Sequence, residues 1–198
     1  MEKTGLIRAV IGDVKLNVIN HNKKAYILED LSKRISKKKI IEALSMVNLN
    51  EDYLLKKTND LSDSEYNKLL FVKDLLNKNK NITLEFFERG LCSKERTYFK
   101  RLLKKLAKEY TINFNIITND LTFCIGLVDE FAIYEDNNLV KTFDKSEIYD
   151  EELYDYFDRN QLFYFVTKSR NYGHLYKDYY DIKDVLKAVY RELEWDIF

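Results

Sequence analysis

The chain has no proline, five glycines, two cysteines, two histidines and no long hydrophobic run. Cys92, Cys124, His21 and His174 are too few and too scattered for a zinc framework, so we expect no metal, no other cofactor and two reduced thiols. No segment approaches the roughly 20 apolar residues that span a bilayer. The N-terminus also lacks the basic-then-apolar order of a secretory signal. These absences predict a cytoplasmic protein, or one held at the inner face of the membrane by a partner.

Neither sign of charge is in excess, because 33 Lys and Arg residues balance 33 Asp and Glu residues. No global field therefore draws the protein to nucleic acid or to an anionic membrane. Hydrophobic residues are abundant, at 45 % of 198 residues, and aromatic residues make up 14 %. That composition is sufficient for a buried core in one domain, with or without an appendage. We expect no nucleic-acid partner, and membrane contact only through another protein.

Patterns typical of strands and helices alternate along the chain. Strands are expected at residues 6–12, 24–29, 81–87, 112–118 and 161–168, with a hairpin over 130–143. Helices are expected from Ser36, from Ser62 (with Glu65 at capping-box spacing), and over 94–109, 121–129 and 182–193. Strands separated by helices indicate an α/β fold with a mostly parallel sheet and flanking helices. We predict a domain over residues 1–146 and a small α+β C-terminal appendage over 147–198.

Four segments follow one another at characteristic spacings, and they are LSDSE (61–65), NITLEF (81–86), SKERTYFKRLLKKLAKEY (93–110) and IITNDL (116–121). In this order they resemble the second half of an ABC-transporter ATPase, the nucleotide-binding subunit that pairs head-to-tail around two ATP molecules. The resemblance covers roughly residues 5–143 and implies a P-loop NTPase core. Residues 5–16 resemble the family's strand pair GEIxIDGKDI.

The resemblance also implies which residues occupy the family's functional positions. The signature LSGGQ aligns with Leu61, Ser62, Asp63, Ser64 and Glu65, and the Walker B Asp-Glu aligns with Glu85 and Phe86. The D-loop aligns with residues 89–92, and the arginine of the following helix aligns with Arg96. The switch histidine aligns with Asn119, which Asp120 follows, and the Q-loop glutamine aligns with Glu29.

No motif of the family is intact in this chain. Gly-x-x-x-x-Gly-Lys occurs nowhere, so the backbone N–H groups and the lysine that cradle phosphates are missing. Phe86 cannot polarise a water, and Asn119 cannot relay a proton as an imidazole does. The signature has lost both glycines to Asp63 and Ser64. We therefore interpret the chain as a degenerate, N-terminally truncated relative that does not hydrolyse ATP.

Simpler interpretations of the same residues remain open. Residues 62–65 form an ordinary capped helix start in one of them. Glu85 lies either at a strand end in solvent, which we favour, or beside a metal or a lysine. For the whole protein the alternatives are a non-catalytic interaction or regulatory subunit, a weak nucleotide-binding regulator, an ATPase completed by a partner, and an enzyme with a new site. We favour the interaction subunit, with an intact ABC ATPase or a membrane permease as partner.

The absent N-terminal part leads to an expectation about association. Its loss is expected to expose apolar surface and an unpaired sheet edge, and such edges pair with other chains. We expect an oligomer or an obligate complex through the region around residues 6–12 and 24–29, unless the appendage covers the gap.

Overall fold

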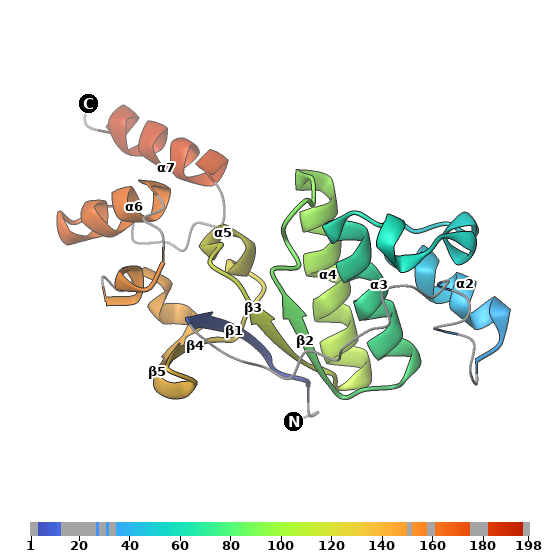
Figure 1. Ribbon diagram of the computed structural model, residues 1–198. Coiled ribbons are helices and arrows are strands. Elements are labelled where there is room, and N and C mark those ends of the chain that lie inside the picture. Colours follow the sequence, from blue (N-terminus) through green and yellow to red (C-terminus); the bar gives the residue numbers. More distant parts are fainter. Residues whose placement is uncertain are drawn as a thin grey trace.

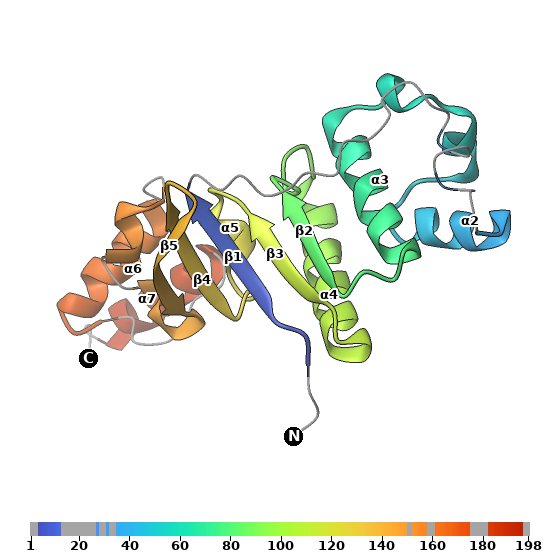
Figure 2. The same ribbon diagram turned by 60° about the horizontal axis from the view of Figure 1, so that its bottom comes forward.

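The structure, a computed structural model, describes residues 4–12, 27, 31, 35–149, 152–157, 161–174 and 182–195. In these residues a five-stranded sheet has the order β2-β3-β1-β4-β5 (Figures 1 and 2). The strands are β1 (Ile7–Gly12), β2 (Asn81–Glu85), β3 (Asn113–Ile117), β4 (Glu130–Glu135) and β5 (Asn138–Asp144). Every neighbouring pair is parallel except β4 and β5. The predicted α/β fold with a mostly parallel sheet is confirmed.

Helices flank this sheet on several sides. They are α2 (Lys37–Ser45), α3 (Asp63–Leu76), α4 (Ser93–Tyr110), α5 (Leu121–Cys124), α6 (Gln161–Asn171) and α7 (Ile182–Trp195), with short 3-10 turns η1 (Glu51–Leu55), η2 (Thr58–Asp60), η3 (Lys145–Tyr149) and η4 (Glu152–Asp155). Figures 1 and 2 show α2 and α3 beyond the β2 edge, and α6 and α7 on the side of β4 and β5. None of the helices described is long and apolar enough to cross a membrane.

Several local predictions are confirmed. β2 and β3 are adjacent and parallel with α4 between them in the chain, which is the arrangement that a mostly parallel sheet with flanking helices implies. α3 begins after Ser62 with the predicted capping box. The β4–β5 hairpin turns at Asp136 and Asn137, whose φ angles of 49° and 66° suit a tight hairpin turn between twisted strands. The start of α3 and the hairpin turn could be predicted because their own residues are typical of a capping box and of a tight turn.

The position of β1 corrects two predictions. β1 lies in the middle of the sheet, where Ala9 is in register with Ile116 of β3 and Phe131 of β4. It is a single strand parallel to both neighbours, so the likeness of residues 5–16 to a strand pair was wrong for β1; residues 13–16 lie outside the described part. Because β1 is paired on both sides, it also leaves no unpaired edge. The edges of this sheet are β2 and β5.

Three other predicted elements differ from the structure. Residues 161–168, predicted as a strand, belong to helix α6, because a short apolar run fits a buried helix as well as a strand. Ile27, inside the predicted strand 24–29, is helical, and so is Leu31; both are buried. The helix expected over 121–129 ends at Cys124. The domain boundary at residue 146 stays a prediction.

Four phenylalanine rings join α3, α4 and the sheet. Phe71 contacts Phe87 and Phe114, with ring centroids 5.8 and 6.1 Å apart. Phe87 contacts Phe99 at 4.9 Å. All four rings are at most 1 % exposed, and all three contacts are edge-to-face. This cluster fixes α3 and α4 against the β2 side of the sheet.

Gly12 ends β1 in a conformation that a side chain cannot share. Its φ is +100°, and a Cβ there would lie 2.0 Å from the carbonyl oxygen of Tyr134. We expect Gly12→Ala to lower the free energy of unfolding by roughly 2–4 kcal/mol, measured by urea denaturation. Gly90→Ala is the control, because Gly90 also has positive φ (+77°) but a Cβ there meets only the Ser64 side chain. Gly90→Ala should cost about 1 kcal/mol. Equal losses would contradict the backbone clash at Gly12.

Candidate functional site

The candidate site lies where the parallel strands β1, β2 and β3 end. In open α/β sheets ligands bind outside the carboxyl ends of the strands. Glu85, the last residue of β2, is in register with Ile117, the last residue of β3. The structure therefore brings Glu85 and Phe86 next to the loop that carries Asn119 and Asp120. Glu85 and Asn119 are both exposed, as we expected for Glu85.

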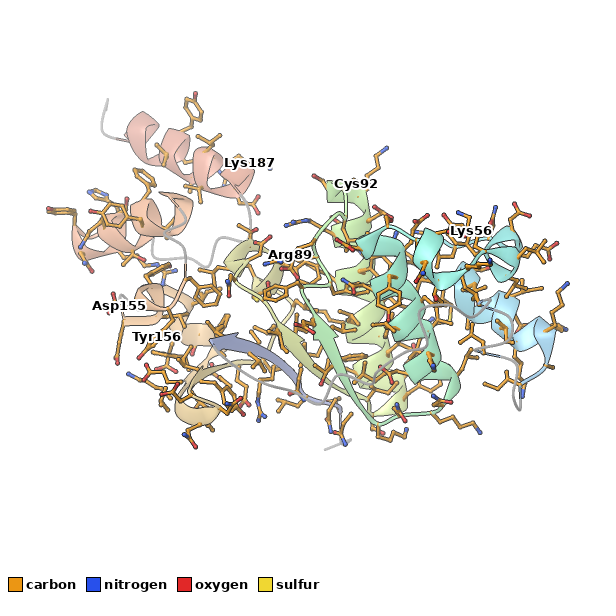
Figure 3. All side chains as sticks on the ribbon, viewed as in Figure 1. Lys56, Arg89, Cys92, Asp155, Tyr156 and Lys187 are labelled. Atoms are coloured by element: carbon orange, nitrogen blue, oxygen red, sulfur yellow. The ribbon has the colours of Figure 1, made fainter. Side chains whose placement is uncertain are left out.

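The turn after β2 is strained at its first residue. Phe86 donates its backbone N–H to the carbonyl oxygen of Ile117 at 2.9 Å, which extends the strand pairing. Its φ is +44°, a region that bulky L-residues rarely adopt. The Arg89 guanidinium lies over the face of the Phe86 ring, with its carbon 3.7 Å from the ring centre. Figure 3 places Arg89 and Cys92 at this edge, near the start of α4. The Phe86 ring thus stacks on the Arg89 guanidinium at the carboxyl edge of the sheet.

The same turn directs Glu88 into the protein interior. Glu88 is 3 % exposed and its Oε1 accepts a hydrogen bond of 2.6 Å from the Thr118 hydroxyl, while Oε2 has no hydrogen-bond partner. Burial raises the pKa of Glu88, and the Thr118 hydrogen bond opposes that rise only in part. Thr118 is fully buried, and its hydroxyl also accepts from the backbone N–H of Asp120 at 2.9 Å. One buried carboxyl thus connects the turn after β2 to the loop after β3.

Asp120 and Arg96 form a second connection between the same two loops. Arg96 Nη1 lies 2.5 Å from Asp120 Oδ2, and Arg96 also donates to the carbonyl oxygens of Glu88 and Leu91, both at 3.4 Å. Asp120 caps α5 by accepting from the N–H of Phe123 at 3.1 Å. Burial acts to raise the pKa of Asp120, but hydrogen bonds from Thr122 and Arg96 outweigh it, and the pKa lies below its usual value. Asp120 is therefore ionised, and its carboxylate holds the start of α5 against Arg96 of α4.

Ser62 and Glu65, which belong to the segment that resembles the family's signature, cap the N-terminus of α3 with their side chains. Ser62 Oγ accepts from the N–H of Glu65 at 3.3 Å, and Glu65 Oε2 accepts from the N–H of Ser62 at 2.8 Å. The Tyr53 hydroxyl donates to Glu65 Oε1, and Lys56 lies 3.9 Å from that oxygen. These contacts lower the pKa of Glu65 to about 2, with the Tyr53 hydrogen bond the largest cause.

The predicted positions fall into two groups that meet near Gly90. A Cβ on Gly90 would lie 3.0 Å from the Cβ of Ser64, so the turn after β2 touches the start of α3. Leu61 and Asp63 belong to that helix start. Glu29 lies outside the described residues, so its prediction is untested.

Sequence reasoning missed the buried groups of this edge. Glu88 and Thr118 have no motif signal, although a carboxylate directly after the apolar pair Phe86 and Phe87 could have drawn notice. Lys100 was also missed; its Nζ donates to the carbonyl oxygens of Thr122 and Ile125 at 2.8 and 3.0 Å. Burial lowers the pKa of Lys100. Across the described part of the chain, no three His, Cys, Asp or Glu residues are grouped so that they could hold a metal ion.

The fold is that of ATP-binding cassettes of ABC transporters. The cassette MJ0796, solved as a dimer in a post-hydrolysis state with ADP and Pi bound, matches with a TM-score of 0.56 and 20 % identity over 71 % of this chain and 63 % of that chain. The cbiO1 protein of Clostridium perfringens, part of the ABC transporter complex cbiONQ, matches with a TM-score of 0.54 and 16 % identity over 75 % of this chain and 81 % of that chain.

The sequence is also similar to those of ATP-binding proteins of import systems. The chain is 26 % identical over 113 residues to the spermidine/putrescine import ATP-binding protein PotA of Photobacterium profundum, and 27 % identical over 115 residues to PotA of Pasteurella multocida. These matches cover 57 % and 58 % of this chain but only 30 % and 31 % of the relatives' length. No protein-family profile matches the chain.

The pKa of Glu65 generates a prediction about acid stability. Because its folded value (about 2) is below the ordinary 4.5, its contribution is complete above pH 4.5 and is lost as the pH falls toward 2. We expect Glu65→Gln to lower the free energy of unfolding at pH 7 by about 1–2 kcal/mol, after allowance for solvent screening, and to flatten the loss between pH 4.5 and 2. Asp63→Asn, in the same helical turn, should change stability by less than about 0.5 kcal/mol. If Glu65→Gln and the wild type lose the same free energy of unfolding between pH 4.5 and 2, the stabilising role of the ionised Glu65 in the capping box is contradicted.

Glu88 generates a prediction of the opposite sign. Its pKa is raised above 4.5, so the native state keeps a proton that the unfolded chain releases, and stability falls as the pH rises from 4.5 through the folded pKa. Glu88→Gln keeps an acceptor for Thr118 and removes the ionisation. The variant should therefore be more stable than the wild type at pH 8, with the difference shrinking toward pH 4.5, as measured by urea denaturation. Glu85→Gln, at the exposed strand end, is the control and should be no more stable than the wild type at pH 8, because its side chain is not buried. A profile of Glu88→Gln that parallels the wild type would refute burial of an ionisable Glu88.

Proposed function

We propose that this protein is a non-catalytic ABC-ATPase-like subunit that acts by binding another protein, an intact ABC ATPase or a membrane permease. The observation that chiefly supports it is the lack of a phosphate-binding loop in the sequence. Such a loop follows a parallel strand, is rich in glycine and ends in Gly-Lys before a helix. β1 is a central parallel strand that ends at Gly12, yet residues 13–34 contain no glycine.

The start of α3 gives independent electrostatic support. A helix N-terminus binds phosphate through free backbone N–H groups and its positive dipole. Here the first turn carries Asp63 and Glu65, and the capping box occupies the N–H groups of Ser62 and Glu65. Two carboxylates at this position repel the triphosphate that the family's signature approaches. The helix start serves stability in place of nucleotide contact.

The strand ends also lack the groups that activate water in the related ATPases. Phe86 occupies the position of the catalytic glutamate, and Asn119 that of the switch histidine. Asp120 is committed to Arg96, and Glu88 is buried beside Thr118. The polar groups described at the strand ends thus hold the loops together, and among them Glu85 is the carboxylate exposed to solvent.

A protein partner is supported by the assemblies of the similar proteins. MJ0796 was solved as a dimer, and cbiO1 is described as part of the ABC transporter complex cbiONQ. The localisation that fits this proposal is the cytoplasm, with any membrane contact made through the partner.

Calorimetry with Mg·ATP tests the proposal. We expect no saturable heat with this chain and ordinary binding with an intact ABC ATPase titrated in parallel. The variant Phe86→Glu/Asn119→His restores both activating side chains but no phosphate loop, so it should remain inactive. ATP turnover above that of a mock purification, in the wild-type chain or in the Phe86→Glu/Asn119→His variant, would contradict the proposal. ATP binding without turnover would favour the nucleotide-binding regulator.

The partner is tested by light scattering after co-expression with an intact ABC ATPase encoded near its gene. A stable complex of defined stoichiometry is expected. A monomer in concentrated solution that forms no complex with the ATPase or its permease would count against an interaction subunit.

A further inference from the structure

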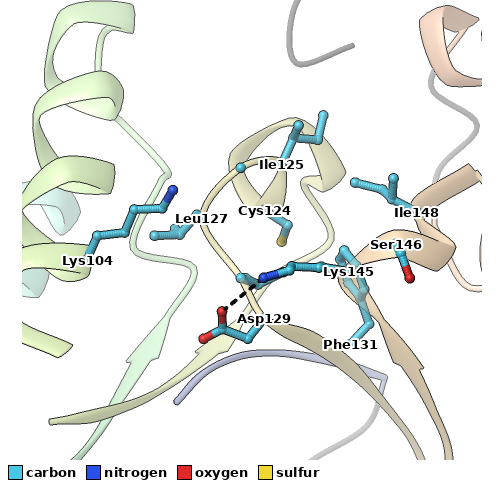
Figure 4. A pocket seen from close by; sticks show the side chains of 11 residues that line it. Lys104, Cys124, Ile125, Leu127, Asp129, Phe131, Lys145, Ser146 and Ile148 are labelled. Carbon is cyan, nitrogen blue, oxygen red and sulfur yellow. Dashed lines mark ion pairs between the residues drawn. The ribbon is translucent and has the colours of Figure 1, made fainter. Parts of the chain in front are cut away.

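A cavity of about 260 Å³ lies beside the C-terminal end of α5. It lies between α4, the loop from α5 to β4, and η3 (Figure 4). Its lining is Lys104, Cys124, Ile125, Gly126, Leu127, Val128, Asp129, Phe131, Lys145, Ser146 and Ile148.

The inner wall of the cavity is apolar. Ile125, Leu127, Val128, Phe131 and Ile148 are each at most 8 % exposed. Binding sites for small molecules combine such walls with a few polar groups that fix orientation. The volume is below the usual range of about 300–1,000 Å³ for drug-sized ligands. A compact apolar group is therefore the part of a ligand that this wall accepts.

The rim of the cavity is positively charged. Figure 4 shows Lys104 reaching in from α4 and Lys145 from the opposite side. Lys145 Nζ lies 3.9 Å from Asp129 Oδ1, but the two side chains are 66 % and 44 % exposed, so the pair is weak. Asp129 Oδ2 already accepts from the N–H of Ile7 at 3.0 Å. Two ammonium groups against one carboxylate leave the lining with a charge of +1.

We infer that this cavity binds a small organic anion, a carboxylate attached to a compact apolar group. The apolar part lies against the inner wall, and the carboxylate accepts charge-assisted hydrogen bonds from Lys104 and Lys145. The net positive charge of the rim disfavours a cation, and a fully polar anion makes no contact that replaces water at the apolar wall. The inference does not depend on the proposed function, because the cavity is separate from the strand ends.

The cavity is nevertheless close to the candidate site along the chain. Cys124 lines the cavity and is the last residue of α5, and Asp120 caps the first turn of the same four-residue helix. Lys100 donates to carbonyl oxygens of Thr122 and Ile125 at both ends of this segment. A ligand in the cavity thus contacts the segment that positions Asn119.

The test titrates this 198-residue chain with four probes by calorimetry and ligand-observed NMR. Phenylacetate and 4-methylpentanoate carry both features of the inferred ligand, phenylacetamide lacks the charge, and acetate lacks the apolar group. We expect saturable binding of the first two, with phenylacetamide and acetate at least about tenfold weaker.

Variants locate the binding site. Lys104→Met keeps the aliphatic stem and removes the charge, so it should weaken phenylacetate binding about tenfold. Lys105→Met is the matched control, since the neighbouring lysine of α4 is exposed and does not line the cavity. It should leave the affinity unchanged.

Three results would overturn the inference. One is the absence of saturable binding of both apolar carboxylates up to about 10 mM. Another is equal affinity for phenylacetate and phenylacetamide, and the third is unchanged phenylacetate affinity in Lys104→Met.

Discussion

Burial of Phe87 between Phe71 and Phe99 is the constraint on which the carboxyl edge of the sheet depends. Phe87 follows β2 by two residues, and its ring must enter the core formed by α3 and α4. The chain therefore turns immediately after Glu85, and Phe86 accepts a positive φ of 44°. Glu88 is then directed inward to Thr118. The aromatic cluster thus sets both the strain and the buried charge at the strand ends.

Elements with strong local signals could be predicted from the sequence. The capping box of Ser62 and Glu65 depends on four consecutive residues, and the hairpin on two residues that tolerate positive φ. The central position of β1 depends on pairing with strands more than 100 residues away, which no local pattern encodes. Residues 161–171 form a helix although their apolar run fits a strand equally well. Long-range pairing and ambiguous short runs account for the failures.

The candidate site shows the same division. The predicted strands at 81–87 and 112–118 lie in one parallel sheet, and parallel strands end at one edge, so residues 85–86 and 119–120 lie together. The motif order could not predict Glu88, since the direction of that side chain follows from the burial of Phe87. It also assigned no role to Lys68, whose Nζ is buried and lies 2.7 Å from Glu95 Oε1. Glu95 in turn accepts from the N–H of Cys92, so this ion pair holds the start of α4.

Most of the polar groups described at this edge form hydrogen bonds or ion pairs with one another. Arg96 neutralises Asp120, and Thr118 both donates to Glu88 and accepts from the N–H of Asp120. A group that activates water must be free to change its proton or its partner during a reaction. The described network instead stabilises one arrangement of two loops, with Glu88 Oε2 the buried side-chain atom left without a hydrogen-bond partner in the described chain. An edge rigidified in this way would lose little conformational entropy on binding a partner, which is compatible with the interaction role proposed above.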